Sequence, residues 1–211
     1  KTSESIESMP LELGNCRIFT PGWLERESIF VHLEYKYFLG LIKAGLYDEY
    51  YEAVNEGLIP FTDPAVYGRS ILENSSFIAS SVNPDETLHG RGFQARLSGS
   101  TSEVVSMWIK MYMGNGGYRC GKDGLELVFD PKLSADMFDD KGEATFTLGG
   151  KTPVTYVNKS GKATYGESGA KISKTVVSLA GKTYEFEGDT VTGIAEQIRN
   201  NEAEKIIVTL D

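Results

Sequence analysis

The hydrophobic periodicity of the chain changes near residue 115. Before this point, aromatic and long apolar residues recur at helical spacing, interrupted by loops rich in Pro, Gly, Asn and Ser. After it, Gly and Thr increase and apolar residues alternate with a period of two, which is typical of half-buried strands. The sequence therefore predicts an α+β chain, with a helical part over residues 1–117 and, over residues 118–211, a small, mainly antiparallel β module with one helix.

Composition excludes several classes of protein. The 211 residues carry 21 basic and 30 acidic side chains, a net charge of −9, which gives no support for general binding to nucleic acid or to an anionic membrane. The longest apolar run, residues 104–113, is interrupted by Ser106 and Lys110 and is shorter than the ~18 residues of a membrane span. Residues 1–10 are polar and acidic, unlike a signal peptide, and they begin without Met, so we expect a processed product or a piece of a longer protein.

Cysteine and histidine are scarce. Cys16 and Cys120 are too few for a disulfide scaffold or a zinc site. One bridge between them is an alternative, but two free thiols in a reducing compartment is the favoured interpretation. With His32 and His89 as the two histidines, a metal cluster would need carboxylates. We therefore expect a cytoplasmic protein without a metal ion.

The first half is expected to contain a helical hairpin. One helix is predicted from about residue 25 to residue 44, with a C-terminal stop at Gly45, and a shorter one from residue 47 to residue 55. The face of the first helix predicted to be apolar contains Ile29, Leu33, Tyr37 and Leu41, widened by Phe30, Phe38 and Ile42, whereas Glu25, Glu27 and Glu34 are interpreted as a solvated face.

A long segment follows, from residue 60 to residue 97, with a possible helix around residues 70–79. Loops of this length in a compact domain are usually functional or disordered, and this one is too aromatic for disorder. Its Glu73 and Asn74 are candidates to hold sugar hydroxyls, or simply cap a turn. His32, in the preceding helix, is either a packing or surface residue, the more common case for a single helical histidine, or an active one.

A capping box opens the next helix. Ser100 is the expected N-cap and Glu103 lies three positions later; the run then continues to Met113 with apolar residues nearly all round, so we expect burial on most sides. The preceding loop carries His89, Arg91, Arg96, Ser98 and Gly99. Glycine, hydroxyl and guanidinium groups before a helix N-terminus suit an anion such as phosphate. The alternative is a well-capped structural helix whose arginines pair with carboxylates.

The second half is expected to be a sheet. A Gly149-Gly150 turn joins a predicted strand over residues 143–148 to another over residues 154–157. Further strands are expected over residues 171–179, 183–187 and 205–210, with an amphipathic helix over residues 191–198 after the candidate cap Asp189.

Several long and unusual motifs stand out along the chain: residues 22–32, 67–70, 73–77, 83–85, 89–93 and 95–101, with residues 146–148, Lys151, residues 154–156 and Asn158 in the β module. Together they resemble the C-terminal third of an inverting glycoside phosphorylase. The β-1,3-oligoglucan phosphorylases are most similar, and the cellobiose phosphorylase family (glycoside hydrolase family ninety-four) is more distant. The resemblance covers about residues 15–211.

The resemblance implies a fold and a reaction. Residues 1–117 would supply the terminal helices of an (α/α)6 catalytic barrel, and residues 118–211 a β-sandwich-like C-terminal module. Such enzymes cleave a β-glucosidic bond with inorganic phosphate and invert the anomeric centre, which gives α-glucose 1-phosphate. His32 matches the family's phosphate-binding histidine, and Ser98-Gly99 matches its Thr-Gly pair, with Ser in place of Thr. Candidate substrate or phosphate contacts are Arg91, Arg96, His89, Glu73 and Asn74.

The family's general acid, an aspartate, lies upstream of the histidine motif, and nothing in residues 1–24 matches it. The chain is therefore expected to carry no catalytic residue and to be inactive alone. Its partners would be a β-glucan oligosaccharide, phosphate, and the missing N-terminal part of the enzyme or another copy; phosphate is a co-substrate and no cofactor is expected. The alternatives are a non-catalytic carbohydrate-binding or domain-packing unit and an inverting hydrolase of the same architecture.

Overall fold

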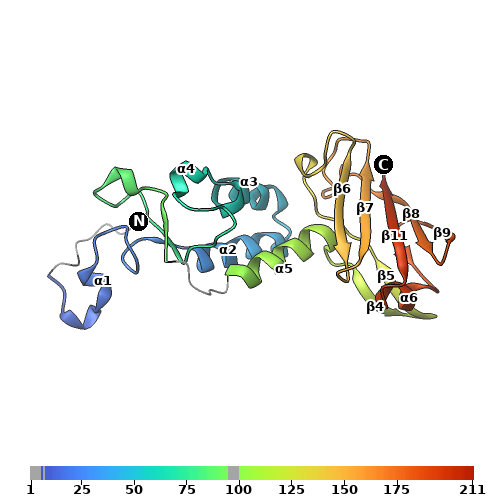
Figure 1. Cartoon of the computed structure of the whole chain (residues 1–211), viewed down its shortest axis with the longest axis horizontal. Helices are drawn as coiled ribbons and strands as arrows, with labels where there is room; N and C mark the ends of the chain where they lie inside the picture. The colour runs from blue at the N-terminus through green and yellow to red at the C-terminus, as the bar shows by residue number, and fades with distance from the viewer. Residues whose placement is uncertain (1–5, 7, 95–99) are drawn as a thin grey trace. The chain divides into compact units, whose positions relative to one another are not determined.

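The computed structural model describes residue 6, residues 8–94 and residues 100–211, and its fold is α+β (Figure 1). The chain divides into two compact units, residues 1–107 and residues 108–211. Helix α5 (Ser100–Met113) contains this division, whereas the sequence pattern placed the boundary after Gly117.

The first unit is mostly helix and loop. Its elements before α5 are the helices α1 (Asn15–Ile18), α2 (Val31–Ala44), α3 (Tyr47–Gly57) and α4 (Pro64–Tyr67), the 3-10 helices η1 (Leu11–Leu13), η2 (Ile59–Phe61) and η3 (Glu86–Leu88), and the strands β1 (Ile29–Phe30), β2 (Phe77–Ile78) and β3 (Gly92–Phe93).

The predicted helical hairpin is confirmed in α2 and α3. Gly45 adopts a left-handed conformation (φ 80°) after α2, its N–H bonds to the carbonyl of Ile42, and the N–H of Leu46 bonds to that of Leu41. This pair of hydrogen bonds is a Schellman motif, which needs the conformational freedom of glycine. The chain then turns at once into α3, whose Tyr50 is buried.

The start predicted for the first helix is wrong, and its buried face is confirmed only in part, at Phe38, Leu41 and Ile42. Residues 25–30 are not helical, because Trp23 and Arg26 exchange two 3.1 Å backbone hydrogen bonds and Leu24 and Glu27 have positive φ. Leu33 and Tyr37, expected in the core, are exposed. The buried residues of α2 are Val31, Tyr35, Phe38, Leu39, Leu41 and Ile42.

The helix predicted around residues 70–79 is absent from the described chain. The Tyr67 hydroxyl donates to the carbonyl of Glu73 (2.7 Å) and accepts from the N–H of Ser75 (2.9 Å), so these backbone groups have partners that an α-helix would not provide. The helix of this segment is α4, where the Asp63 carboxylate caps the N–H of Ala65 and Pro64 occupies the first turn.

Three two-residue strands form a small sheet in the order β1-β2-β3, and each neighbouring pair is antiparallel. Its central row is aromatic: Phe30 and Phe93 both lie opposite Phe77, and the ring of Trp23 stacks on Phe93 with centroids 3.9 Å apart. Strands this short depend on such packing for their stability. The small sheet therefore joins segments that lie far apart in the sequence.

Helix α5 has the bounds predicted for it, from Ser100 to Met113. The residue before Ser100 lies outside the described chain, so the N-cap is not assigned. The predicted burial on most sides is wrong: Met107, Met111 and Tyr112 are buried, but Val105, Trp108 and Ile109 are exposed.

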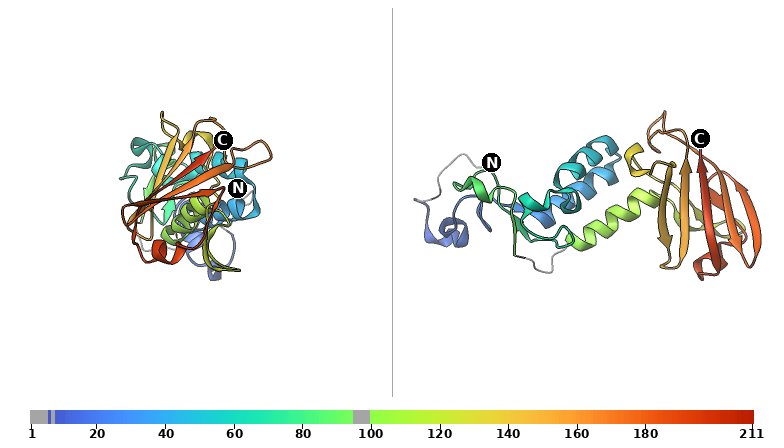
Figure 2. Two further views of the ribbon diagram at one scale, coloured as in Figure 1. Left: turned by 90° about the vertical axis from the view of Figure 1, so that its right-hand side faces the viewer. Right: turned by 45° about the horizontal axis from the view of Figure 1, so that its top comes forward.

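The second unit contains two sheets (Figure 2). Its elements after α5 are the strands β4 (Gly117–Gly121), β5 (Gly124–Val128), β6 (Glu143–Leu148), β7 (Thr152–Asn158), β8 (Ile172–Leu179), β9 (Lys182–Glu187), β10 (Thr190–Val191) and β11 (Ala203–Leu210), with η4 (Ala135–Met137) and α6 (Ala195–Arg199).

The larger sheet has the order β6-β7-β11-β8-β9, with β11 parallel to β7 and every other pair antiparallel. Alternate residues are buried, as the period-two pattern predicts, and Tyr156, Val208 and Thr175 form one fully buried row across its centre. The smaller sheet has the order β10-β5-β4.

The helix predicted over residues 191–198 is too long. Val191 belongs to β10 and lies opposite Leu127, and the helix begins only at Ala195. Asp189 does not cap it, because the carbonyl of Asp189 accepts the N–H of Phe129 and its carboxylate accepts the Thr190 hydroxyl.

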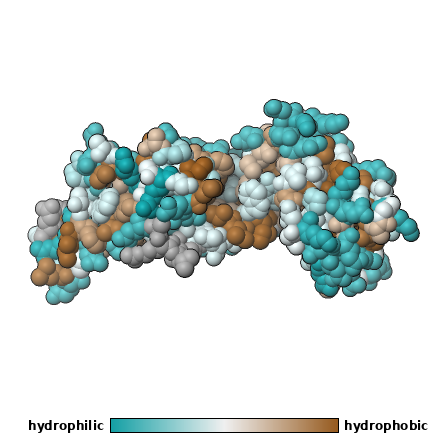
Figure 3. Space-filling model, viewed as in Figure 1, coloured by the Kyte–Doolittle hydropathy of each residue, from teal (hydrophilic) through white to brown (hydrophobic). Residues whose placement is uncertain are grey.

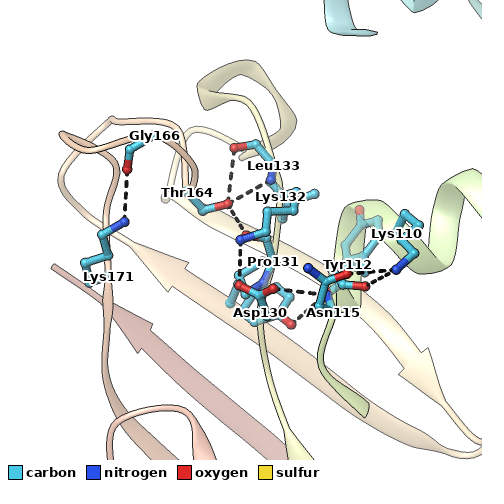
Figure 4. A network of polar contacts seen from close by, with 12 residues as sticks. Lys110, Tyr112, Asn115, Asp130, Pro131, Lys132, Leu133, Thr164, Gly166 and Lys171 are labelled. Carbon is cyan, nitrogen blue, oxygen red and sulfur yellow. Dashed lines mark hydrogen bonds and ion pairs between the residues drawn. The ribbon is translucent and has the colours of Figure 1, made fainter. Parts of the chain in front are cut away.

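A buried polar network fixes the loops of the second unit (Figure 4). Thr164 donates its hydroxyl to the carbonyl of Pro131 (2.7 Å) and accepts the N–H of Leu133 (2.8 Å). Asp130 pairs with Lys132 at 2.6 Å. The two bonds of Thr164 hold the segment after β5 against the loop between β7 and β8.

Within the described residues, no helix is long and apolar enough to cross a membrane. Cys16 and Cys120 are both free and exposed.

Candidate functional site

The small sheet brings several candidate residues to one of its ends. Strand β1 leads directly into α2, which carries His32 in its first turn. Asn74 lies just before β2, and β3 precedes residues 95–99 and α5 in the chain. Because β1 and β3 both run antiparallel to β2, the ends of β1 and β3 lie beside the start of β2. Backbone hydrogen bonds from Val31 to Ser76 and from Ser76 to Gln94 continue the pairing at this end.

His32 lies against the first turn of α5. Its Nε2 atom is 3.4 Å from Oε1 of Glu103, and the two side chains are 38% and 15% exposed. The contact is an ion pair when the imidazole is protonated. A histidine and a helix N-terminus that are far apart in the sequence therefore meet at one place, and both can contribute to the binding of an anion.

Three of the predicted site residues, Arg96, Ser98 and Gly99, lie outside the described residues. The predicted contact between His32 and Ser98 therefore stays a prediction. What the structure describes is the helix that directly follows them and its contact with His32.

Asn74 and Glu73 are held by neighbours at the same end of the sheet. The Tyr35 hydroxyl donates to Oδ1 of Asn74 at 3.3 Å and accepts the N–H of Ile59 at 3.2 Å. Glu73 pairs with Arg69 at 3.1 Å. Asn74 is thus attached to α2 three residues after His32, whereas the carboxylate of Glu73 has a basic partner in its own loop.

His89 and Arg91 lie at the other end of the small sheet. The N–H of Ala79, which follows β2, bonds to the carbonyl of Arg91, which precedes β3. The Nε2 atom of His89 is 2.8 Å from the carbonyl oxygen of Asn83, and the exposed Arg91 donates Nε to the carbonyl of Thr87 at 3.0 Å. The structure does not bring these two residues together with His32.

The sequence interpretation missed Glu34, a half-buried residue whose Oε2 atom is buried. It lines a cavity of about 380 Å³ in the first unit, together with Ile29, Glu56, Gly57, Phe61, Thr62, Asp63, Val66, Tyr67, Ile78 and Gly90. Burial raises the pKa of the Glu34 carboxyl to about 7. The sequence interpretation placed Glu34 on a solvated face with Glu25 and Glu27, but on α2 it lies beside the buried Val31, Tyr35 and Phe38.

No group of three or more His, Cys, Asp and Glu side chains in the described part of the chain is arranged to hold a metal ion. No protein-family model matches the chain, and no curated protein matches it.

Proposed function

We propose that the chain is the C-terminal part of an inverting glycoside phosphorylase that cleaves a β-glucosidic bond with inorganic phosphate and releases α-glucose 1-phosphate. The observation that supports this most is the 3.4 Å contact between His32 and Glu103, since it places the histidine of the resemblance at the helix that follows Ser98-Gly99. In this proposal, phosphate binds at that helix end.

The chemistry suits this arrangement. Phosphate is already anionic, so the enzyme needs to position it and offset its charge rather than deprotonate a nucleophile. A protonated imidazole and the first N–H groups of α5 offer positive charge and hydrogen-bond donors. Glu103 weakens phosphate binding in this proposal, because its carboxylate competes with phosphate for Nε2 of His32. Phosphate avoids this competition if it binds the other ring nitrogen.

The exposed apolar side chains fit the proposal that the chain is one part of a larger assembly. Leu33 and Tyr37 on α2 are exposed, as are Val105 and Ile109 on α5, and Figure 3 shows hydrophobic residues gathered over α5. We propose that α2, α3 and α5 are the last helices of an (α/α)6 barrel whose other helices cover these residues. The two sheets of the second unit would be the β-sandwich-like module.

Phosphate binding tests the proposal directly. We expect ³¹P NMR or calorimetry to detect phosphate binding to the chain, and His32→Ala to weaken it roughly ten- to hundredfold through loss of a charge-assisted contact. His89→Ala is the matched control, since His89 lies at the other end of the small sheet, and it should leave the affinity unchanged. Glu103→Gln should strengthen binding, because it removes a negative charge beside the phosphate. Equal losses in the two histidine variants would contradict the assignment.

Activity is the second test. No residue of the chain matches the family's general acid, so the chain alone should release no α-glucose 1-phosphate from laminaribiose or cellobiose with phosphate. Turnover of roughly 1 per second or more, as in an ordinary enzyme, would show that the general acid is present.

One observation favours a second candidate, a carbohydrate-binding role of the β module. A cavity of about 290 Å³ in the second unit is lined by Trp108, Tyr112, Tyr118 and Phe146, among others. Aromatic lining is common in ligand pockets. In a Trp23→Phe background Trp108 is the remaining tryptophan, so laminari-oligosaccharides that bind here should change its fluorescence, and Trp108→Ala should abolish binding measured by NMR. An unchanged affinity in Trp108→Ala would reject this role.

A further inference from the structure

The cavity beside Glu34 has an apolar wall built by several elements. Ile29 comes from β1 and Ile78 from β2, while Phe61, Val66 and Tyr67 come from η2 and α4. Phe61 is about half exposed, so an aromatic ring lies where the cavity meets solvent. A volume of about 380 Å³ is enough for a small organic molecule with one ring.

Glu34 extends from α2 to the end of α3. A Cβ atom placed on Gly57 would lie 2.8 Å from Oε1 of Glu34 and 2.8 Å from Cζ of Phe38, so the carboxyl group occupies space that a larger residue would take. The Oε2 atom is buried, and it has no hydrogen-bond partner among the described residues. Buried polar atoms are normally paired, so this oxygen needs a donor that the described chain does not supply.

The charged residues that line the cavity beside Glu34, among those that the structure describes, are acidic. Glu56 faces the cavity from α3 and Asp63 from the start of α4, Tyr67 lines it from α4, and Tyr35 interacts electrostatically with Glu34 on α2. Among the residues that the structure describes, those that line the cavity include no Lys, Arg or His. On the neighbouring loop, Arg91 is exposed and donates to the carbonyl of Thr87.

We propose that this cavity binds a small organic cation, a protonated primary amine on an apolar or aromatic frame, with Glu34 as its counter-ion. The ammonium group donates to the unpartnered Oε2 atom, and the frame packs on the apolar wall. The aromatic rings of Phe61 and Tyr67 add to the attraction for a cation. This site uses none of the residues of the proposed phosphate site, so each of the two proposals can be tested and rejected independently of the other.

The experiment compares benzylamine with benzyl alcohol, which have nearly the same shape but differ in charge. We expect ¹⁵N–¹H NMR titrations of the chain at pH 8 to show benzylamine binding at residues that line the cavity, and benzyl alcohol binding at least tenfold more weakly. Glu34→Gln should weaken benzylamine binding at least tenfold. Glu52→Gln removes an exposed carboxylate from α3 outside the cavity and should leave binding within twofold of wild type.

The pH dependence has a defined sign. The ammonium needs the ionised carboxylate, and burial raises the pKa of Glu34 to about 7, so benzylamine affinity should increase roughly tenfold or more between pH 5.5 and pH 8. A titration of the Glu34 carboxyl in the wild-type chain gives a test that does not depend on whether the variants fold. The ¹³C chemical shift of the Glu34 carboxyl should report a lower pKa when benzylamine is added.

Three results would overturn the proposal. These are no benzylamine binding up to 10 mM, equal binding of benzylamine and benzyl alcohol, and a Glu34 carboxyl titration that benzylamine leaves unchanged. Phosphate binding at His32 is measured independently, so failure here leaves the proposed function untouched.

Discussion

The phenol hydroxyl of Tyr156 donates a 2.6 Å hydrogen bond to the backbone carbonyl of Tyr112. Tyr156 lies in β7 with no exposed surface, and Tyr112 lies in the last turn of α5. Helix carbonyls at this end have no partner within the helix, so the tyrosine satisfies one of them. The same two rings pack with Phe146, with centroids 5.2 and 5.8 Å away. One side chain therefore fixes the end of α5 to the larger sheet of the second unit.

Tyr156→Phe should destabilise the second unit by about 1–3 kcal/mol, because it leaves the buried carbonyl of Tyr112 without its donor while the ring packing stays. Urea denaturation followed by near-ultraviolet circular dichroism measures the loss. Tyr184→Phe, at a half-buried position on β9, is the control and should change the free energy of unfolding by less than about 0.5 kcal/mol. Equal effects of the two substitutions would show that the hydroxyl of Tyr156 contributes little.

Local patterns predicted the elements that depend on local interactions. The ends of α2 and α5 and the strands β6 to β9 follow from apolar periodicity and from glycine at turns. The start of α2 does not, because the turn at Trp23 is held by ring stacking on Phe93 and by positive φ at Leu24 and Glu27. No periodicity in residues 22–30 encodes a partner that lies some seventy positions away.

The sequence likewise predicted only part of the candidate site. Sequence reasoning selected His32 and the start of α5, and the structure describes a contact between them. It could not separate His89 and Arg91 from His32, since that separation follows from the antiparallel pairing of the small sheet. It also missed Glu34, because whether a helical carboxylate is buried depends on what α3 and α4 place over it.

Two glycine substitutions should have opposite effects in the first unit. Gly40 lies within α2 and has open space around the position of a Cβ atom, so Gly40→Ala should stabilise the unit by about 0.5–1 kcal/mol through helix propensity. Gly92 lies in β3, where a Cβ atom would overlap the ring of Tyr67 and lie 2.5 Å from Oγ of Ser75. Gly92→Ala should therefore destabilise the unit by about 3 kcal/mol or more.

Thermal unfolding of the two variants, followed by far-ultraviolet circular dichroism, checks both signs at once. The same displacement of Tyr67 should weaken the contacts that the segment of residues 73–75 makes with α2, so Gly92→Ala should also change the NMR signal of Asn74. A Gly92→Ala variant as stable as wild type would show that the small sheet tolerates a side chain at this position.

Thr164 provides a test of the polar network in the second unit (Figure 4). Thr164→Val keeps the shape but removes the hydroxyl that serves Pro131 and Leu133, and it should cost about 1–3 kcal/mol because both backbone groups are buried. Thr164→Ser keeps the hydroxyl and should recover most of the loss. Urea denaturation at one pH is sufficient, and a serine variant no more stable than the valine variant would argue against the hydrogen bonds as the cause.

Glu34→Gln should change stability in a way that depends on pH. Burial raises the pKa of the folded carboxyl to about 7 from a reference value of 4.5, so the folded chain binds more protons than the unfolded chain between these values. The free energy of unfolding of the wild type should consequently fall as pH rises through this window, by about 1–3 kcal/mol in total. Glutamine is neutral throughout and lacks this dependence. At pH 8 the variant should therefore be more stable than wild type by a similar amount, whereas at pH 5 the difference should be much smaller.

Urea denaturation at pH 5, 6.5 and 8 measures the trend, and Glu52→Gln should give a curve parallel to wild type. A difference between Glu34→Gln and wild type that is equal at pH 5 and pH 8 would mean that the carboxylate is as well solvated in the folded chain as in the unfolded one.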